Sequence, residues 1–366
     1  MKNKYAKIYI LFVATAAVLT GCYPKGVSTI SEMESNDSEY IISEIASENE
    51  HLTIDVTLPE NVPDQLPKVN VNVMEWDEDV VNDLYLFPRQ NLIHSEYPCD
   101  FFTGENYQLF ESTDESAYRL VYEPGRLSSA VREKFVKYGY GTLESGFGTY
   151  CFSDYYNDGV EDYLGSEAEK ELIRQLVQLG LTNLANPEVY LVTAEKANEY
   201  FSLKGYDEYE KWTDDNQIFL VRYPLEYGGI KVTTDASSDL VSGGHGSYFV
   251  GSYITAIVTN NEVLSLDCQN IMSAKYDTGK TVSIVCNASH ALKVAAEYYD
   301  AMSLGDSDIK LLDLSLVYVP FEQHSEKEFT LVPMWKVNAV VKNEEDIMGS
   351  FNYLFIDAED GHIIIW

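Results

Sequence analysis

The chain has 366 residues, and its 59 acidic side chains against 25 lysines and arginines give a formal charge of −34 at pH 7. Such an excess of acid excludes nucleic acid as a partner, because phosphate recognition needs a basic surface. With 45% hydrophobic and 23% charged residues, the composition is that of a globular protein, and the length predicts about two domains at ~150 residues each.

Residues 1–21 have the pattern of a bacterial lipoprotein signal peptide. Three lysines precede a mainly apolar run over residues 8–19, which is too short to span ~30 Å of hydrocarbon. Leu19-Thr20-Gly21-Cys22 then resembles a lipobox, whose cysteine receives a diacylglycerol. We therefore expect cleavage after residue 21 and an acyl anchor on Cys22 that holds the protein on the extracytoplasmic face of the cell membrane. The alternative is an ordinary signal peptide with a chance cysteine.

Residues 22–50 follow as an acidic segment rich in Ser, Glu and Asn. From Tyr23 to Glu50 there are seven acids against the single Lys25, and few apolar side chains. Because such a composition cannot bury enough apolar surface to fold, we predict a disordered tether between the anchor and the folded part.

Four cysteines remain once Cys22 is lipidated: Cys99, Cys151, Cys268 and Cys286. An even number outside the membrane permits disulfides, with three possible pairings. Proximity in the sequence favours Cys268 with Cys286 and Cys99 with Cys151, and the alternative is four buried free thiols. No CxxC spacing occurs, so the sequence indicates neither a zinc cluster nor a redox dithiol.

Residues 51–160 are predicted to be mostly β. Apolar residues alternate with polar ones over 52–58 and 69–73, with a proline-containing loop between the two strands. A further strand over 118–122 ends at Pro124-Gly125, and residues 128–138 are interpreted as a helix.

Residues 161–286 and 287–366 each show a helix followed by strands. The first begins with a capping box at Ser166 and Glu169, a helical face and a stop at Gly180. A second helix is expected over 194–203, with strands at 189–192, 218–223, 229–233, 248–258 and 263–266. The last unit has a helix ending near Met302 and strands at 311–319, 329–341, 351–358 and 362–366. We therefore predict an α+β fold: two successive modules of one helix packed on an antiparallel sheet, with an extra helix inserted into the first.

Two motifs near the C-terminus resemble known families. They are Pro333-Met334-Trp335-Lys336-Val337, and the hairpin Tyr353-Leu354-Phe355-Ile356-Asp357-Ala358-Glu359-Asp360-Gly361. Residues 287–366 thereby resemble YycI-like and PepSY-like extracytoplasmic modules, although YycI-like proteins carry an uncleaved transmembrane helix in place of the lipobox. The whole chain is similar to uncharacterised lipoproteins of clostridial Gram-positive bacteria, which implies no activity and no functional residues.

No motif predicts catalytic, cofactor-binding or metal-binding residues. Neither Gly-x-Ser-x-Gly nor His-Glu-x-x-His occurs. For Cys286 and His290, a structural thiol and a surface histidine are favoured over a nucleophilic pair. Residues 154–165 lack the ligands of a calcium loop, and Gly243-Gly244-His245-Gly246 lacks the lysine of a phosphate-binding loop.

The sequence therefore favours a non-enzymatic, lipid-anchored module that binds a protein or peptide at the cell envelope, possessing no cofactor. Two alternatives stay open. The 28 tyrosines suit a carbohydrate- or solute-binding lipoprotein, because aromatic faces stack on sugar rings. A carboxylate-dependent envelope hydrolase is the other, because paired acids meet only in space and leave no sequence motif. The oligomeric state is not predicted.

Overall fold

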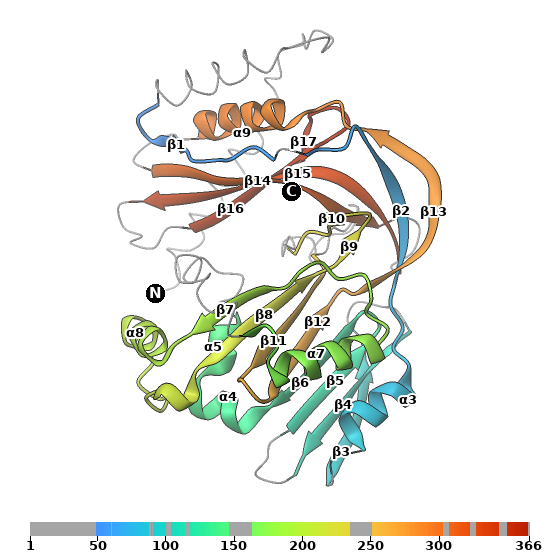
Figure 1. Ribbon diagram of the computed structural model, residues 1–366, viewed down its shortest axis with the longest axis vertical. Coiled ribbons are helices and arrows are strands. Elements are labelled where there is room, and N and C mark those ends of the chain that lie inside the picture. Colours follow the sequence, from blue (N-terminus) through green and yellow to red (C-terminus); the bar gives the residue numbers. More distant parts are fainter. Residues whose placement is uncertain are drawn as a thin grey trace, which may run out of the picture.

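The computed structural model describes residues 49–59, 61–87, 89, 91–99, 104–113, 118–145, 163–234, 251–302, 307–322, 327–343 and 350–364. It is mostly β, with about 47% strand and 24% helix. Two large sheets form the two halves of the molecule (Figure 1). The predicted α+β fold of two helix-on-sheet modules is therefore wrong. Within the described residues, no helix is both long and apolar enough to cross a membrane.

The first large sheet has eight antiparallel strands and is called here the eight-stranded sheet. In spatial order its strands are β3 (Leu92–Pro98), β4 (Asn106–Ser112), β5 (Tyr118–Glu123), β6 (Arg126–Val131), β12 (Val263–Gln269), β11 (Tyr253–Val258), β8 (Ile218–Pro224) and β7 (Glu188–Val192). Strands β3 to β6, which are consecutive in the sequence, form one half of this sheet, and they join the other half through β12, which begins more than a hundred residues after β6.

Helices cover the two faces of the eight-stranded sheet unequally. One face packs under α3 (Glu78–Val81), the π-helix η1 (Asn82–Leu86) and α7 (Glu167–Gln178). The other carries α4 (Arg132–Tyr138), α5 (Tyr140–Ser145), α8 (Ala194–Lys204) and the short 3₁₀ helix η4 (Asp214–Asn216). The core under these last helices takes its strand residues from β7, β8, β11 and β12. The β3–β6 half of this face is outside that core.

The second large sheet has seven strands and is called the seven-stranded sheet. It contains β1 (Leu52–Ile54), β14 (Ser307–Glu322), β15 (Glu328–Asn343), β16 (Ser350–Asp357) and β17 (Ile363–Ile364), with β2 (Gln65–Val73) pairing both β15 and β13 (Met272–Ser283). The β1–β14 pair is parallel. Helix α9 (Ala288–Met302) lies on this sheet above buried Trp335 (Figure 1). A small hairpin, β9 (Glu226–Tyr227) and β10 (Ile230–Lys231), lies between the halves.

Local predictions were more accurate than the predicted topology. Ser166 caps α7, its hydroxyl accepting a hydrogen bond from the Glu169 N–H at 3.1 Å. The Asp360-Gly361 hairpin is also present, with Gly361 at φ +78°. The helix predicted over 128–138 is wrong in its first part, because residues up to Val131 form strand β6. Pairing with both β5 and β12 outweighs the local helical pattern there.

The two sheets meet where β2 and β13 leave one sheet for the other. Gly125 N–H donates to Met74 O at 2.7 Å, Met74 N–H to Ile271 O at 2.9 Å, and Ile271 N–H to Gly125 O at 2.8 Å. Residues of both sheets share one core, which includes Tyr318 and Leu120. The units predicted at 51–160 and 161–286 each supply strands to both sheets, which is why successive helix-on-sheet modules do not form.

Candidate ligand-binding groove

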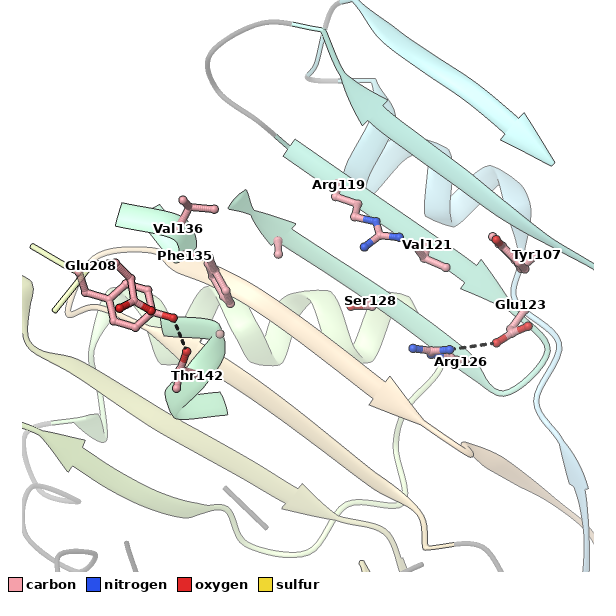
Figure 2. A pocket seen from close by; sticks show the side chains of 13 residues that line it. Tyr107, Arg119, Val121, Glu123, Arg126, Ser128, Phe135, Val136, Thr142 and Glu208 are labelled. Atoms are coloured by element: carbon pink, nitrogen blue, oxygen red, sulfur yellow. Dashed lines mark hydrogen bonds and ion pairs between the residues drawn. The ribbon is translucent and has the colours of Figure 1, made fainter. Parts of the chain in front are cut away.

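A groove of about 770 Å³ lies on the face of the eight-stranded sheet that α4 and α5 border (Figure 2). Its floor comes from β4, β5 and β6, and its wall from α4, α5 and the segment after α8. The lining residues are Tyr107, Arg119, Val121, Glu123, Arg126, Ser128, Ala130, Phe135, Val136, Gly141, Thr142, Glu208 and Tyr209. The groove therefore combines aromatic and aliphatic surface with two cationic side chains.

The β5–β6 hairpin places both arginines on the floor. Side chains alternate along a strand, so Arg119, Val121 and Glu123 share one face, and cross-strand pairing puts Arg126 beside Glu123. The tight turn at Pro124-Gly125 is held by the Trp76 indole, whose Nε1–H donates to the carbonyls of both Glu123 and Arg126, at 2.8 and 2.9 Å. Trp76 thereby fixes the position of the Arg126 end of the floor.

Glu123 is a buried carboxylate whose two oxygens both have partners. Its side chain is 5% exposed; Oε1 lies 3.5 Å from Arg126 Nη1, and Oε2 accepts a hydrogen bond from the Cys99 thiol at 2.7 Å. The Arg126 side chain is 43% exposed, so its outer part faces the groove. Nη1 is its only guanidinium nitrogen with a hydrogen-bond partner among the described residues. Arg126 therefore neutralises Glu123 and retains unused donors.

Asp267 adds a second acid beside this pair. It lies on β12 opposite Ser128, and both of its carboxylate oxygens accept hydrogen bonds from Gln269 Nε2, at 2.8 and 3.0 Å. Burial raises the pKa of the Asp267 carboxyl, while Gln269, Arg126 and Ser128 act in the opposite direction. Asp267 is thus held in place next to the groove floor.

Arg119 marks the other end of the floor. Its Nε lies 3.7 Å from Glu111 Oε1, and its side chain is 47% exposed. Among the described residues its guanidinium makes no hydrogen bond within 3.5 Å. On the wall, the hydroxyls of Thr142 and Tyr209 are 2.8 Å apart and hold the α5 side together (Figure 2).

Exposed apolar side chains extend the groove face toward the sheet edge. Tyr97 on the edge strand β3 is 44% exposed and stacks on Tyr107, with ring centroids 5.2 Å apart. Ile93, on the same face of β3, is 57% exposed, and Val136 on the wall is 70% exposed. A ligand lying here would find apolar contact surface on both sides of the arginines.

The structure separates the cysteines that proximity in the sequence would pair. Cys268 on β12 lies in the core under α7, whereas Cys286 lies in the core between α9 and the seven-stranded sheet. Both are free thiols, so the predicted bond between them is absent. Cys99 contacts Glu123 at the groove end, and Cys151 lies outside the described residues.

Cys286 and His290 do approach one another around the hairpin at Gly361, where a Cβ atom on that glycine would meet both side chains. Burial, together with the nearby Asp357 and Asp360 carboxylates, raises the pKa of the Cys286 thiol to about 12. Burial also lowers the pKa of His290. A protonated thiol beside a neutral imidazole is not an activated nucleophile, in agreement with the structural interpretation.

Other residues singled out in the sequence, namely Cys22, the acidic stretch from residue 154 and the Gly-rich segment 243–246, lie outside the described residues, except that Gly165 is described. In the part of the chain that is described, no three His, Cys, Asp or Glu side chains are placed to hold a metal ion.

Sequence reasoning missed the groove, although part of its signal was present. Alternation in Arg119-x-Val121-x-Glu123, followed by Pro124-Gly125 and Arg126-x-Ser128-x-Ala130, is the pattern of a hairpin with one mixed polar face. The helix predicted over 128–138 concealed it. The wall of the groove could not be predicted from local sequence patterns, because only tertiary packing places α5 and Tyr209 beside the floor.

Comparisons with known proteins give a fold and no family. No family model matches the chain, and no curated protein matches it. A solved structure of an uncharacterized protein from Eubacterium rectale ATCC 33656 is similar, with a TM-score of 0.61 and 13% sequence identity, covering 91% of this chain and 100% of that one. At that identity the likeness shows the fold alone. The YycI-like, PepSY-like and clostridial lipoprotein resemblances stay predictions.

Proposed function

We propose that this chain is a lipid-anchored extracytoplasmic protein that binds a peptide or protein segment, without catalysis, in the groove of the eight-stranded sheet. The observation that carries the proposal is the groove itself, an open cavity of about 770 Å³ with aromatic and aliphatic surface flanking two arginines. Arginine and exposed aromatic side chains are the residue types that contribute most to binding at protein interfaces.

The state of the acids favours binding over hydrolysis. A general acid or base must present an oxygen to the substrate. Both oxygens of Glu123 and both oxygens of Asp267 are instead occupied by neighbouring side chains. Glu123 is therefore paired with Arg126 and Cys99, and Asp267 with Gln269, so the carboxylate-dependent hydrolase is the weaker alternative.

Site-specific photo-crosslinking in native membranes tests the groove. A photoreactive amino acid in place of Ser128, on the floor, should capture an envelope polypeptide, whereas one in place of Ile173, on the outer side of α7, should not. Ala130→Trp, which fills the groove, should abolish capture from Ser128. Equal capture from both positions, or capture that survives Ala130→Trp, would contradict the proposal.

The anchor is tested separately with Cys22→Ala. We expect the parent chain to incorporate labelled fatty acid and to partition with membranes, and the variant to do neither, because stable anchoring depends on acyl chains. Membrane retention of the unlabelled variant would contradict lipidation at this residue while leaving the groove proposal intact.

A second depression gives the carbohydrate alternative a specific location. It has a volume of about 990 Å³ at one end of the eight-stranded sheet, and its lining includes Asp214, Asp215, Asn260, Asn261 and Tyr138. Carboxylates and carboxamides can hydrogen-bond several hydroxyls while a tyrosine ring stacks on a sugar face. Calorimetric titration with neutral glycans, on the parent chain and on Asn261→Ala, tests it; no heat on the parent chain removes this function.

A further inference from the structure

We propose that Arg119 and Arg126 recognise two carboxylates of one extended peptide, four residues apart. This inference rests on the proposed function and adds the chemistry and spacing of the partner. The groove would select acidic side chains at positions i and i+4 whose intervening residues cross the apolar part of the floor.

The spacing follows from the strand register. Arg126 pairs directly with Glu123, and Arg119 precedes Glu123 by four residues on β5. At a rise of about 3.3 Å per residue, the two arginines lie roughly 13 Å apart along the strand direction. Val121 and Ser128 line the floor between them (Figure 2). An extended peptide has the same rise and the same alternation, so its residues i and i+4 match this distance and point to one side.

The donors available at each end suit a carboxylate. Arg126 offers only Nη1 to Glu123, at the long distance of 3.5 Å, and Arg119 faces Glu111 at 3.7 Å. The Arg126 side chain is 43% exposed and that of Arg119 is 47% exposed, although Nε of Arg126 itself is buried. A planar guanidinium with free N–H groups binds a carboxylate through two parallel hydrogen bonds, which gives both strength and orientation.

Charge makes these two residues decisive. The chain carries a formal charge of −34, so its overall field repels an acidic ligand. Among the residues that line the groove, Arg119 and Arg126 are the only cations, and Glu123 and Glu208 are the only acids. Binding of an acidic peptide therefore has to come from this local pair together with the apolar contacts of the floor and wall, and it should weaken when either arginine is removed.

The partner is a peptide rather than a small dianion because the two arginines lie roughly 13 Å apart along the strands, with Val121 between them on the floor. Val121, Ala130 and Phe135 line the groove and offer surface to aliphatic side chains. An aliphatic or β-branched sequence between the acids would both fill this stretch and favour the extended conformation.

Fluorescence anisotropy with two labelled peptides of equal composition tests the spacing. The first is Glu-Val-Thr-Val-Glu, flanked by Ser-Gly, and the second is Glu-Val-Thr-Glu-Val with the same flanks, which places its acids on opposite sides of an extended chain. We expect the i, i+4 peptide to bind the full chain at least about tenfold more tightly, the effect of one good charge-assisted contact.

Matched charge variants locate the site. Arg119→Gln and Arg126→Gln should each weaken the i, i+4 peptide about tenfold or more and reduce the salt dependence of binding. Arg174→Gln removes the same charge from α7, on the opposite face of the sheet, and should leave binding unchanged. Circular dichroism of all three variants serves as the control that they fold.

The outcomes separate this inference from the proposed function. If both peptides bind equally, or if Arg174→Gln weakens binding as much as the groove variants do, the two-carboxylate inference is overturned while crosslinking from Ser128 can still support a groove partner. If neither peptide binds and no polypeptide is crosslinked from Ser128, both fail together.

Discussion

The buried acids show how single residues in this molecule are tuned by their partners. Glu123 and Asp267 lie beside the same arginine, and each has both oxygens occupied. Burial raises the pKa of the Asp267 carboxyl, while Gln269, Arg126 and Ser128 act in the opposite direction. The ionised form of Asp267 therefore lowers the stability of the folded state.

The cost at Asp267 predicts a specific pH dependence. A carboxyl whose pKa is raised above its unfolded value of 3.8 binds its proton more tightly in the folded state, so stability falls as pH rises through the interval between the two values. Asp267→Asn removes this ionisation. Urea unfolding at pH 4 and pH 7 should show that the parent chain loses stability relative to the variant at the higher pH. An unchanged difference between the two pH values would contradict it.

Thiol reactivity provides the second residue-scale prediction. Cys268 is fully buried and burial raises its pKa well above the ordinary value, and Cys286 is 1% exposed with its pKa raised to about 12. Neither should react with a neutral thiol reagent in the folded protein, because both are protonated and covered. Mass spectrometry after labelling should detect both only after unfolding in denaturant. Failure to label them under non-reducing denaturing conditions would indicate the disulfide that the structure lacks.

At the scale of elements, α7 shows how a sequence pattern becomes packing. Its N-cap at Ser166 and the spacing of Ala168, Leu172 and Leu176 give one face that is buried against the eight-stranded sheet. Its other face carries the Glu171–Arg174 pair, in which Arg174 hydrogen bonds lower the pKa of Glu171. The helix is held mainly by burial of the first face, since an exposed ion pair contributes about 0.3–0.5 kcal/mol.

Adjacent residues of α7 make a matched test of this account. Leu172 is 0% exposed and Ile173 is 42% exposed. Leu172→Ala should lower the free energy of unfolding by about 2–5 kcal/mol, because it leaves a cavity against the sheet. Ile173→Ala, a change of similar size one residue away, should lower it by less than about 1 kcal/mol. Equal losses in chemical denaturation would contradict the assigned face.

Elements of this kind are also where sequence reasoning succeeded. The cap at Ser166, the Pro124-Gly125 turn and the Asp360-Gly361 hairpin are all determined by residues next to one another, and all three are present. Residues 128–131 were assigned to a helix although they form a local hairpin with β5; their second strand partner, β12, comes more than a hundred residues later. The long strand β13 was missed because its partner β2 lies two hundred residues earlier.

For the whole molecule, nonlocal pairing decides the architecture. Strand β2 pairs with both β13 and β15, and Tyr318 of the seven-stranded sheet donates a hydrogen bond to Pro67 O at 2.8 Å. Lys327 then links the halves through Glu75 and Glu105, at 2.7 Å each. No succession of local patterns contains this information, which is why the mostly β fold and the groove that spans β4 to α5 were not predictable from one sequence.

The shared core predicts that the two halves unfold together. Trp335 lies buried in the seven-stranded half and Trp212 in the α8 core of the other half, so each can report its own half by fluorescence. One reporter chain carries Trp76→Phe, Trp212→Phe and Trp366→Phe, and the other carries Trp76→Phe, Trp335→Phe and Trp366→Phe. In each reporter chain, the urea midpoint from tryptophan fluorescence should equal the midpoint from far-ultraviolet circular dichroism of the same chain. A single cooperative unit requires this agreement for both tryptophans.

Gly125 is the position at which this coupling can be broken. It has φ +70°, and a Cβ atom there would lie 2.7 Å from Val73 Cγ1, at the junction where Gly125, Met74 and Ile271 exchange backbone hydrogen bonds. Gly125→Val should therefore strain the junction and separate the two fluorescence midpoints, whereas Gly104→Val, at a positive φ in open space, should leave them together. Two separate midpoints in the parent reporters would instead mean that the halves are independent domains, and that the core common to both sheets contributes little to their stability.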